Sequence, residues 1–298
     1  MKNRDAFSGC HPVVNFLYFA MVLVFAMCFL HPVCLGMSLV SALAYSIYLK
    51  GGKAVRFAVL YMLPMMVLAA VLNPAFNHGG VTILAYLPDG NPLTLESILY
   101  GLDSAVLLVG VIVWFTCFNE VMTSDKFVYL FGRIIPALSL VISMTLRFVP
   151  RFVEQTRTIS QSQKCIGRDA STGSVWQRLR NGATILSIMV TWALENAIES
   201  ADSMKSRGYG LPGRTAFSIY RIDERDKHML LWLGFCGVYI ISGWITGAFY
   251  WRFIPSIKHV EITPFTLSFM LVYLLLCLTP LILNVKEDNT WKRLRSGI

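Results

Sequence analysis

Charged residues are scarce in this chain. They make up 14% of its 298 residues, against 55% hydrophobic residues, and the mean hydropathy is +0.58. Soluble domains carry about 25% charged residues, so this composition favours a polytopic membrane protein over a soluble domain.

The common signatures of catalysis and cofactor binding are also missing. The phosphate-binding pattern Gly-x-x-x-x-Gly-Lys-Ser/Thr is absent, since Gly51-Gly52-Lys53 is followed by Ala54. No Gly-x-Ser-x-Gly elbow occurs, and the five histidines show no zinc-ligand spacing. The seven cysteines contain no Cys-x-x-Cys pair and are interpreted as packing residues of a reducing compartment. We therefore expect a protein that is not an enzyme and has no metal or cofactor.

What the chain does contain is six long apolar runs. Each has 16 to 24 residues and at most one charge, the length that a helix needs to cross roughly 30 Å of hydrocarbon. His31-Pro32 predicts a tight turn between the first two runs, and Pro64 predicts a kink in the third. Asp103 lies near the outer end of the fourth, where we expect its carboxylate to reach the interface. The predicted spans are Val13–Leu30, Val33–Leu49, Phe57–Leu72, Ser97–Asn119, Met229–Trp251 and Ile262–Val285.

Lysine and arginine are distributed unevenly among the loops. With both termini in the cytoplasm, 24 of the 26 basic residues face inward and only Arg252 and Lys258 face outward. Basic residues gather on the cytoplasmic side of membrane proteins. The sequence therefore predicts a multi-pass protein of a prokaryotic cell membrane. The net charge of +9 has the same explanation, so we expect the lipid bilayer and no nucleic acid among its partners.

The chain divides into three predicted parts. Residues 1–119 form an N-terminal membrane part with four spans, and residues 229–298 form a C-terminal part with two spans and a basic tail. Residues 120–228 are too charged to cross a bilayer twice and read as two long amphipathic helices facing the cytoplasm. The predicted fold class is all-α, with about six transmembrane helices and these two additional helices.

The first of the two helices is expected from Pro136 to about Gly167. Proline is favoured in a first helical turn, and Pro150 predicts a kink. Beyond Pro150, apolar residues recur at spacings of three and four. Glycine is a natural cap at the C-terminal end because it accepts a left-handed backbone.

The second helix is expected from about Val175 to Arg207. Basic residues in its last turn suit the negative end of the helix dipole, and Gly208 can cap it. A basic last turn followed by glycine is an ordinary way for a helix to end. Two such ends in succession, on helices too polar to span, indicate cationic tips that dock into acidic grooves of a partner. The apolar face of this helix consists of Ile185, Ile188, Met189 and Trp192.

These residues resemble the transmembrane T component of energy-coupling factor (ECF) transporters, the CbiQ/EcfT family. The family has a segment like Leu146–Pro150, then an Ala-Gln-x-x-Arg-Gly motif and an Ala-x-x-x-Arg-Gly-Tyr motif. Here the two motifs read Ser162–Gly167 and Ser203–Gly210, in matching order and spacing. The first departs from the family pattern because Ile166 stands in place of arginine. One possibility is that Lys164 or Arg168 supplies the cation at the first motif. The other is that the contact of the first motif with its partner is apolar, and Arg207 of the second motif is the stronger anchor.

The resemblance implies a scaffold subunit of a vitamin or metal-ion importer. Two cytoplasmic ATPase subunits, as a homo- or heterodimer, would receive the two helix ends in their grooves and supply the ATP hydrolysis. The apolar face of the second helix would hold a separate substrate-binding membrane subunit, the S component, and closure of the ATPases would tip that subunit. The implied ATPase-coupling residues are Lys164, Ile166, Gly167, Arg168, Ser206, Arg207 and Gly208.

Two alternatives stay open. A self-contained secondary transporter would need ionisable residues deep in its spans, and this chain offers only Asp103, near one end. An intramembrane enzyme would need a convergent acid, base or metal cluster. Its candidates are Glu195, Glu199 and Asp202, which are more simply a solvated face.

Overall fold

The chain forms two compact units. In this computed structural model, residues 5–86, 91–134, 136–169, 171, 173–211, 220–261 and 263–296 are described. Residues 1–126 together with 220–298 form the first unit, which we call the membrane unit. Residues 127–219 form the second, which we call the central unit. The predicted N- and C-terminal membrane parts fall in one unit, and the division of the chain into three parts stays a prediction.

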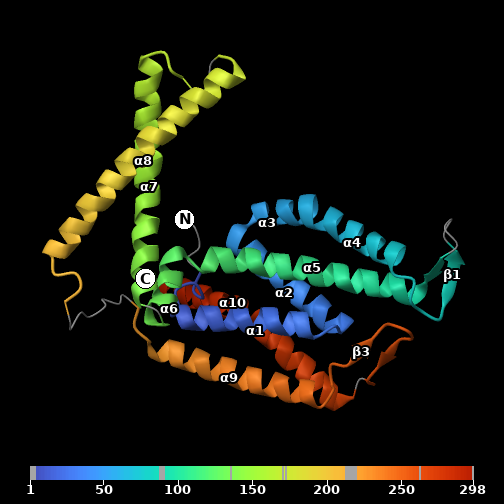
Figure 1. Ribbon diagram of the computed structural model, residues 1–298. Helices are drawn as coiled ribbons and strands as arrows, with labels where there is room; N and C mark the ends of the chain where they lie inside the picture. The colour runs from blue at the N-terminus through green and yellow to red at the C-terminus, as the bar shows by residue number, and fades with distance from the viewer. Residues whose placement is uncertain are drawn as a thin grey trace. The chain divides into compact units, whose positions relative to one another are not determined.

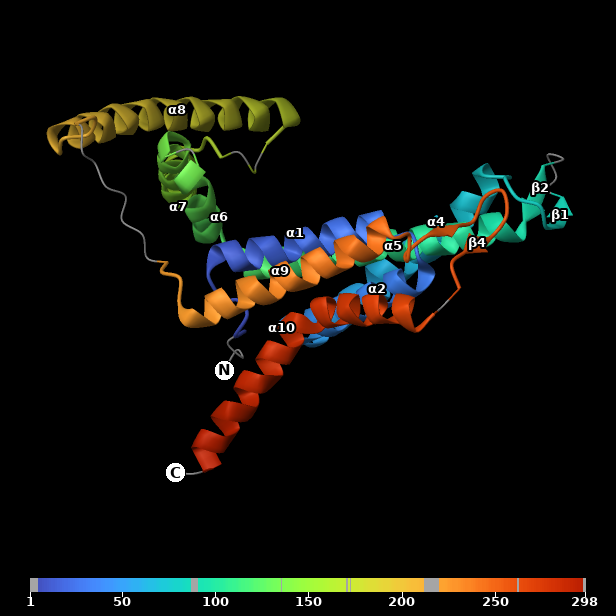
Figure 2. The same cartoon turned by 90° about the horizontal axis from the view of Figure 1, so that it is seen from below.

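Long helices make up most of the membrane unit (Figures 1 and 2). Helix α5 packs against α1, α2 and α4, while α10 packs against α2 and α9. The bounds are α1 (Pro12–Cys28), α2 (Pro32–Lys50), α3 (Gly52–Phe57), η1 (Ala58–Met62), α4 (Leu63–Phe76), α5 (Leu95–Val121), α9 (Glu224–Ile245) and α10 (Pro264–Ser296).

Among the described residues, five helical segments are long and apolar enough to cross a membrane: Pro32–Lys50, Gly52–Phe76, Leu95–Val121, Glu224–Ile245 and Pro264–Leu294. Helix α1 is equally apolar but shorter, at 17 residues. The expected all-α polytopic membrane protein is confirmed, and the helix break at residues 29–31 agrees with the turn predicted at His31-Pro32.

The third span contains a π-turn directly before Pro64. The Leu63 N–H donates to the Ala58 carbonyl, a bond five residues back instead of the usual four. Proline has no N–H, and its ring clashes with the carbonyl four residues earlier in a regular helix. A wider turn relieves this clash, and this π-helix lies directly before the proline at which the sequence predicts a kink.

Two short hairpins join the helices at one end of the unit, and the sequence prediction missed both. Strands β1 (Ile83–Tyr86) and β2 (Pro92–Thr94) pair antiparallel between α4 and α5. Strands β3 (Trp251–Arg252) and β4 (Lys258–His259) pair between α9 and α10. Strands of two to four residues are too short to show an alternating pattern.

The predicted fifth span, Met229–Trp251, extends six residues beyond the C-terminal end of the observed helix α9, which is Ile245. Helix α9 ends at Ile245 because Gly247 adopts a left-handed φ of 76°. The Gly247 N–H donates to the Trp244 carbonyl and the Ala248 N–H to the Gly243 carbonyl, at 3.0 and 2.9 Å. This is the double hydrogen bond of a Schellman motif, which satisfies the last carbonyls and turns the chain out of the helix.

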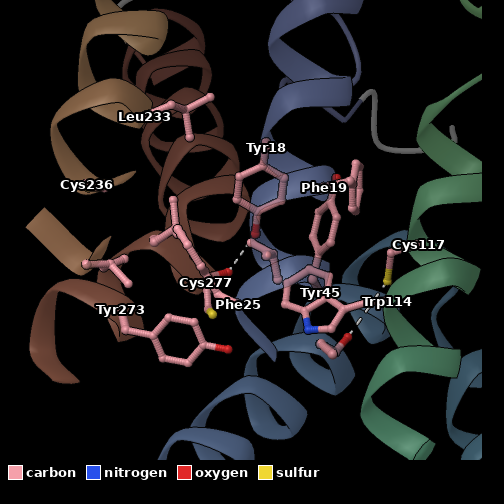
Figure 3. Packing of buried hydrophobic residues seen from close by; sticks show 14 of the residues in the cluster. Tyr18, Phe19, Phe25, Tyr45, Trp114, Cys117, Leu233, Cys236, Tyr273 and Cys277 are labelled. Atoms are coloured by element: carbon pink, nitrogen blue, oxygen red, sulfur yellow. Dashed lines mark hydrogen bonds between the residues drawn. The ribbon is translucent and has the colours of Figure 1, made fainter. Parts of the chain in front are cut away.

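A continuous aromatic core holds the membrane unit together (Figure 3). Trp114 of α5 is fully buried against Tyr18 and Phe19 of α1, and its Nε1 donates to Ser38 Oγ at 2.9 Å. The Tyr18 hydroxyl reaches the Cys277 carbonyl of α10 at 2.9 Å. Each of these edge-to-face ring contacts contributes about 0.5–1.5 kcal/mol beyond the buried area.

The segment before α1 is tied into this unit by polar contacts. The Ala6 N–H donates to Asn284 Oδ1 at 2.7 Å, and Tyr45 donates to Asp5 at 2.9 Å. The His11 N–H donates to Asp226 Oδ1 at 3.0 Å, and buried Lys126 donates to the Ser8 carbonyl. Burial lowers the pKa of Lys126. The segment therefore connects the starts of α6 (Ser124–Ile134) and α9 with α2 and α10. These contacts lie where the chain leaves the membrane unit and returns to it.

Asp103 corrects one prediction. We expected its carboxylate to reach the interface, but the side chain is only 6% exposed, on the packed face of α5. Its Oδ2 has no hydrogen-bond partner among the described residues. The reason is its position on the helix, on the same face as the buried Gly110 and Trp114, which a count of residues from the helix end does not reveal.

The central unit has three helices and almost no core. Helix α6 (Ser124–Ile134) leads into it, and α7 (Pro136–Cys165) and α8 (Val175–Ser206) cross each other (Figure 1). The two long helices match the predicted ones, and α7 continues through Pro150. Among the residues of this unit whose burial is described, only Ile159 is buried. The stability of these helices therefore depends on their caps, on the contacts where they cross and on any partner that covers them.

Candidate functional site

The first candidate motif forms the C-terminal end of α7. Helix α7 ends at Cys165, and Gly167 follows with a φ of 73°. The Gly167 N–H donates to the Lys164 carbonyl at 3.0 Å, and the Arg168 N–H donates to the Gln163 carbonyl at 2.9 Å. These two bonds define a Schellman motif, with Ile166 as the C-cap residue.

The second candidate motif ends α8 in the same way. Arg207 is the C-cap residue, and Gly208 has a φ of 82°. The Gly208 N–H donates to the Lys205 carbonyl at 3.1 Å, and the Tyr209 N–H donates to the Met204 carbonyl at 3.0 Å. Both glycines are where the sequence predicted them, and each has the left-handed backbone that favours glycine there.

The predicted coupling residues lie on the surface of the central unit. Ile166 is 62% exposed, an unusual position for isoleucine, and Gly208 is half-buried. The motifs do not meet in one site, since the C-terminal ends of α7 and α8 lie at separate corners of the crossed pair (Figures 1 and 2). The remaining predicted residues are exposed: Lys164, Gly167, Arg168, Ser206 and Arg207.

The charged groups at the two ends have few partners. Lys164 Nζ lies 3.9 Å from Asp169 Oδ2, a loose ion pair in which the lysine side chain is 71% exposed and the aspartate side chain 14%. Ser206 donates its hydroxyl to the Ser203 carbonyl at 2.9 Å, so it reinforces the last turn of α8. Within the described part of the chain, no hydrogen bond or ion pair occupies the guanidinium of Arg168 or Arg207. Both guanidiniums are therefore available to a carboxylate of another protein.

The loop after α7 is connected to the start of α8. Asn181 donates through Nδ2 to the Asp169 carbonyl at 2.9 Å, and the Asp169 carboxylate accepts from the Ser171 backbone N–H at 3.1 Å. Helix α8 begins with a capping box in which Ser174 and Gln177 bond each other's backbone. These contacts hold the first motif next to α8.

Two of the four residues predicted to hold a substrate-binding subunit lie at the helix crossing. The ring of Trp192 packs edge-to-face against Phe152 of α7, with 5.7 Å between centroids. Met189 Sδ lies 3.6 Å from Thr156 Oγ1. Both side chains are half-buried, as is Ile185, and Ile188 is exposed at the border of the crossing. The role of the four in partner binding stays a prediction.

A second apolar row on α8 was not selected from the sequence. Its members repeat at intervals of seven and four residues, and all are more than half exposed: Leu179, Leu186, Val190, Leu194 and Ile198. The spacing was available in the sequence, but it competes with the crossing face on the same helix. Only the position of α7 shows which face is left uncovered. We call these five residues the α8 apolar row.

Three acidic residues of α8 were the candidates for an intramembrane enzyme. Glu195, Glu199 and Asp202 are all exposed on α8. Within the described ranges, no group of three or more His, Cys, Asp or Glu side chains could hold a metal ion.

Comparison with known proteins identifies the family. A family model described as "Cobalt transport protein", CbiQ, matches residues 9–219, which include both capped helix ends. This chain belongs to the CbiQ family. The resemblance drawn from the two motifs is thereby confirmed.

Curated relatives of this CbiQ-family chain carry the name energy-coupling factor transporter transmembrane protein EcfT. The protein from Bacillus selenitireducens is 38% identical over 94 residues, covering 31% of this chain and 35% of the relative. EcfT 1 from Listeria monocytogenes is 27% identical over 186 residues, covering 58% and 66%. The chain therefore spans less than two thirds of the length of the relatives it matches.

Proposed function

We propose that this chain is the membrane scaffold subunit of an ECF-type importer. It couples ATP hydrolysis by two cytoplasmic ATPase subunits to the reorientation of a separate substrate-binding membrane subunit, which carries a vitamin or a metal ion. The EcfT name of its relatives supports the transporter class, and the absence of a phosphate-binding loop in the sequence fits a partner that supplies the ATPase.

The observation that carries this proposal is the pair of matched helix ends. Each is a Schellman motif with a lysine in the last turn, a glycine directly after the cap residue and an arginine next to that glycine. They belong to helices whose unit is almost without a core. A guanidinium at the end of a stiff helix can form two parallel hydrogen bonds with a carboxylate of a partner. These two bonds fix both the orientation of the helix end and its distance from the partner, so motion of the partner is transmitted to the helix.

The α8 apolar row is the surface that we assign to the substrate-binding subunit. Met189 and Trp192 already contact α7, whereas the row is exposed along about five turns of α8. An uncovered apolar stripe on a helix indicates a protein or lipid contact.

Arg207→Glu tests the ATPase joint. The substitution puts a carboxylate opposite the carboxylate expected in the partner, so we expect ATPase co-purification to fall about tenfold or more, with loss of uptake. Arg180→Glu is the matched control, because it makes the same charge change at an exposed arginine of the same helix, away from the caps. Undiminished assembly and uptake in Arg207→Glu would remove the proposed role.

The orientation is tested separately. With both termini and the central unit in the cytoplasm, a membrane-impermeant thiol reagent reaches exposed Cys165 only in inside-out vesicles. Labelling of Cys165 from the outside of intact cells would exclude contact between the central unit and cytoplasmic ATPases.

Asp103 favours a second candidate function, a self-contained secondary transporter. A buried carboxylate with an unsatisfied oxygen inside a spanning helix is the kind of group that such proteins use for ions or protons. Under this alternative the purified chain alone, in liposomes, would transport, and Asp103→Asn would abolish it. Transport that needs added ATPase subunits and survives Asp103→Asn would exclude the alternative.

A further inference from the structure

The first turns of α8 differ in charge from the rest of the helix. Between residues 170 and 194 the sequence has two basic residues, Arg178 and Arg180, and no aspartate or glutamate. Three acidic residues lie within four positions of Ile198 in the second half of the helix: Glu195, Glu199 and Asp202. Helix α8 thus has a cationic start, followed by an acidic stretch.

The cationic start also exposes large apolar side chains. Trp176 is 83% exposed, Val175 71% and Leu179 61%. The three lie on one side of the helix, because residues three and four positions apart share a face. An open hollow of about 500 Å³ continues along this face, past Gly182 to Leu186. A Cβ on Gly182 would meet nothing within 4 Å, so the described chain leaves this face uncovered there.

The two arginines border the apolar face on both sides. Arg178 and Arg180 are the sequence neighbours of Leu179, so on a helix they lie about 100° to either side of it. Both side chains are exposed. We call Val175, Trp176, Arg178, Leu179 and Arg180 the α8 start patch. Helices that lie on a membrane surface have this arrangement, with basic side chains that extend to the headgroups and tryptophan at the boundary between hydrocarbon and water.

The charge of the α8 start patch favours a lipid surface over a protein groove. A groove that receives Trp176 and Leu179 would need an anionic partner at each of its two rims to pair both arginines. A headgroup layer of anionic phospholipid supplies phosphates all around the apolar face. A guanidinium binds phosphate through two hydrogen bonds, and basic segments next to a membrane are attracted to anionic lipids.

The connection between the two units keeps the patch near lipid. The central unit is joined to the membrane unit at both of its ends, after residue 126 and before residue 220. The headgroups are therefore present at a high local concentration, and a weak affinity is sufficient for binding.

We propose that the α8 start patch binds the surface of the bilayer. Trp176, Val175 and Leu179 enter the boundary between headgroups and hydrocarbon, and the two arginines bind the phosphates of anionic phospholipids. The same surface repels the acidic stretch around Ile198. This inference goes beyond the proposed function, because it gives the central unit a lipid contact that requires no other subunit. Leu179 is the residue that this patch shares with the α8 apolar row.

Wide lipid nanodiscs test the patch on the full chain. A polarity-sensitive fluorophore is attached to Val175→Cys or to the control Ile198→Cys, whose native side chains are 71% and 65% exposed. The exposed cysteines Cys28 and Cys165 are replaced by serine in both. The discs contain phosphatidylcholine alone or mixed with phosphatidylglycerol. In the anionic discs we expect blue-shifted emission and about threefold lower quenching by acrylamide at position 175, with no change at position 198.

Matched variants separate the charges from the aromatic ring. Arg178→Gln with Arg180→Gln should abolish the difference between the two kinds of disc at position 175. Lys205→Gln with Arg207→Gln removes the same charge from the far end of α8 and should leave that difference unchanged. Trp176→Ser should reduce the blue shift in anionic discs, because serine does not insert at the interface. Thermal unfolding of the full chain checks that each variant folds.

Three outcomes would overturn the inference. The first is the same emission at position 175 in both kinds of disc, and the second is an equal loss from the two pairs of charge variants. The third is shielding of position 175 that appears only when another protein subunit is bound, which would make the patch a protein contact. The proposed ATPase contact is tested separately, because co-purification in detergent contains no lipid surface.

Discussion

Two tryptophans mark the difference between the units. Trp114 is fully buried in the membrane unit, among rings from α1 and beside Ser38 of α2, whereas Trp176 on α8 is 83% exposed. The membrane unit buries a continuous aromatic cluster across its helices, and the described part of the central unit buries only Ile159. One unit thus supplies its own packing, while the other presents apolar side chains and cations for partners to cover. The predictions below test this division.

The tryptophan pair should show the largest difference in stability. Trp114→Ala removes a buried side chain and leaves a cavity, so we expect a loss on the order of 3 kcal/mol or more in the free energy of unfolding. Trp176→Ala should change it by less than about 0.5 kcal/mol in the isolated chain. Thermal unfolding of the purified chain in one detergent measures both. Equal losses would contradict the division.

Polar substitutions in the α8 apolar row should separate stability from assembly. Leu186→Gln with Leu194→Gln should leave the isolated chain within about 0.5 kcal/mol of wild type, yet lower co-purification of the substrate-binding subunit at least tenfold. Leu233→Gln is the matched control, because Leu233 is fully buried in α9. It should destabilise the isolated chain. A row variant that unfolds like the control would show that the row packs internally.

The N-terminal segment allows a finer test within the membrane unit. Asp226 is buried and accepts from the His11 and Asp223 N–H groups through its two oxygens. Asp226→Asn faces one of these donors with an amide NH₂, so we expect a loss of about 1–3 kcal/mol. Glu224→Gln breaks only an exposed pair with Lys227, which should cost less than about 1 kcal/mol. Similar losses in the free energy of unfolding from the two variants would contradict the structural role of the segment before α1.

The smallest expected effect is a pH dependence at the turn between α1 and α2. Burial, with a smaller contribution from His259, lowers the pKa of His31, and the His31 ring packs edge-to-face against Trp251. The unfolded chain then binds more protons than the folded one as the pH falls below 6.5 toward the lowered pKa. Stability is therefore full above this window and decreases within it. Unfolding temperatures across the window should fall less in His31→Gln, and an identical fall would exclude His31 as the cause.

The sequence predicted the helices and both caps because their signals are local. Apolar runs of membrane length, prolines at helix starts and glycines at helix ends each act within a few residues, and α7 and α8 match their predicted ranges closely. Asp103 was misplaced because its burial depends on which neighbours α5 packs against. The α8 apolar row was missed for a similar reason, since only the position of α7 distinguishes the crossing face from the uncovered one.

The central claim concerns where apolar side chains are buried. In the membrane unit they are buried among its own helices, whereas in the central unit they are buried only when partner proteins bind. Hydrogen–deuterium exchange measures this directly, by comparing α8 (Val175–Ser206) with α5 (Leu95–Val121) in the isolated chain and in the complex purified from native membranes. We predict that α8 exchanges much faster than α5 in the isolated chain and becomes strongly protected in the complex, with little change in α5. Equal protection of α8 and α5 in the isolated chain, unchanged by the partners, would contradict the account.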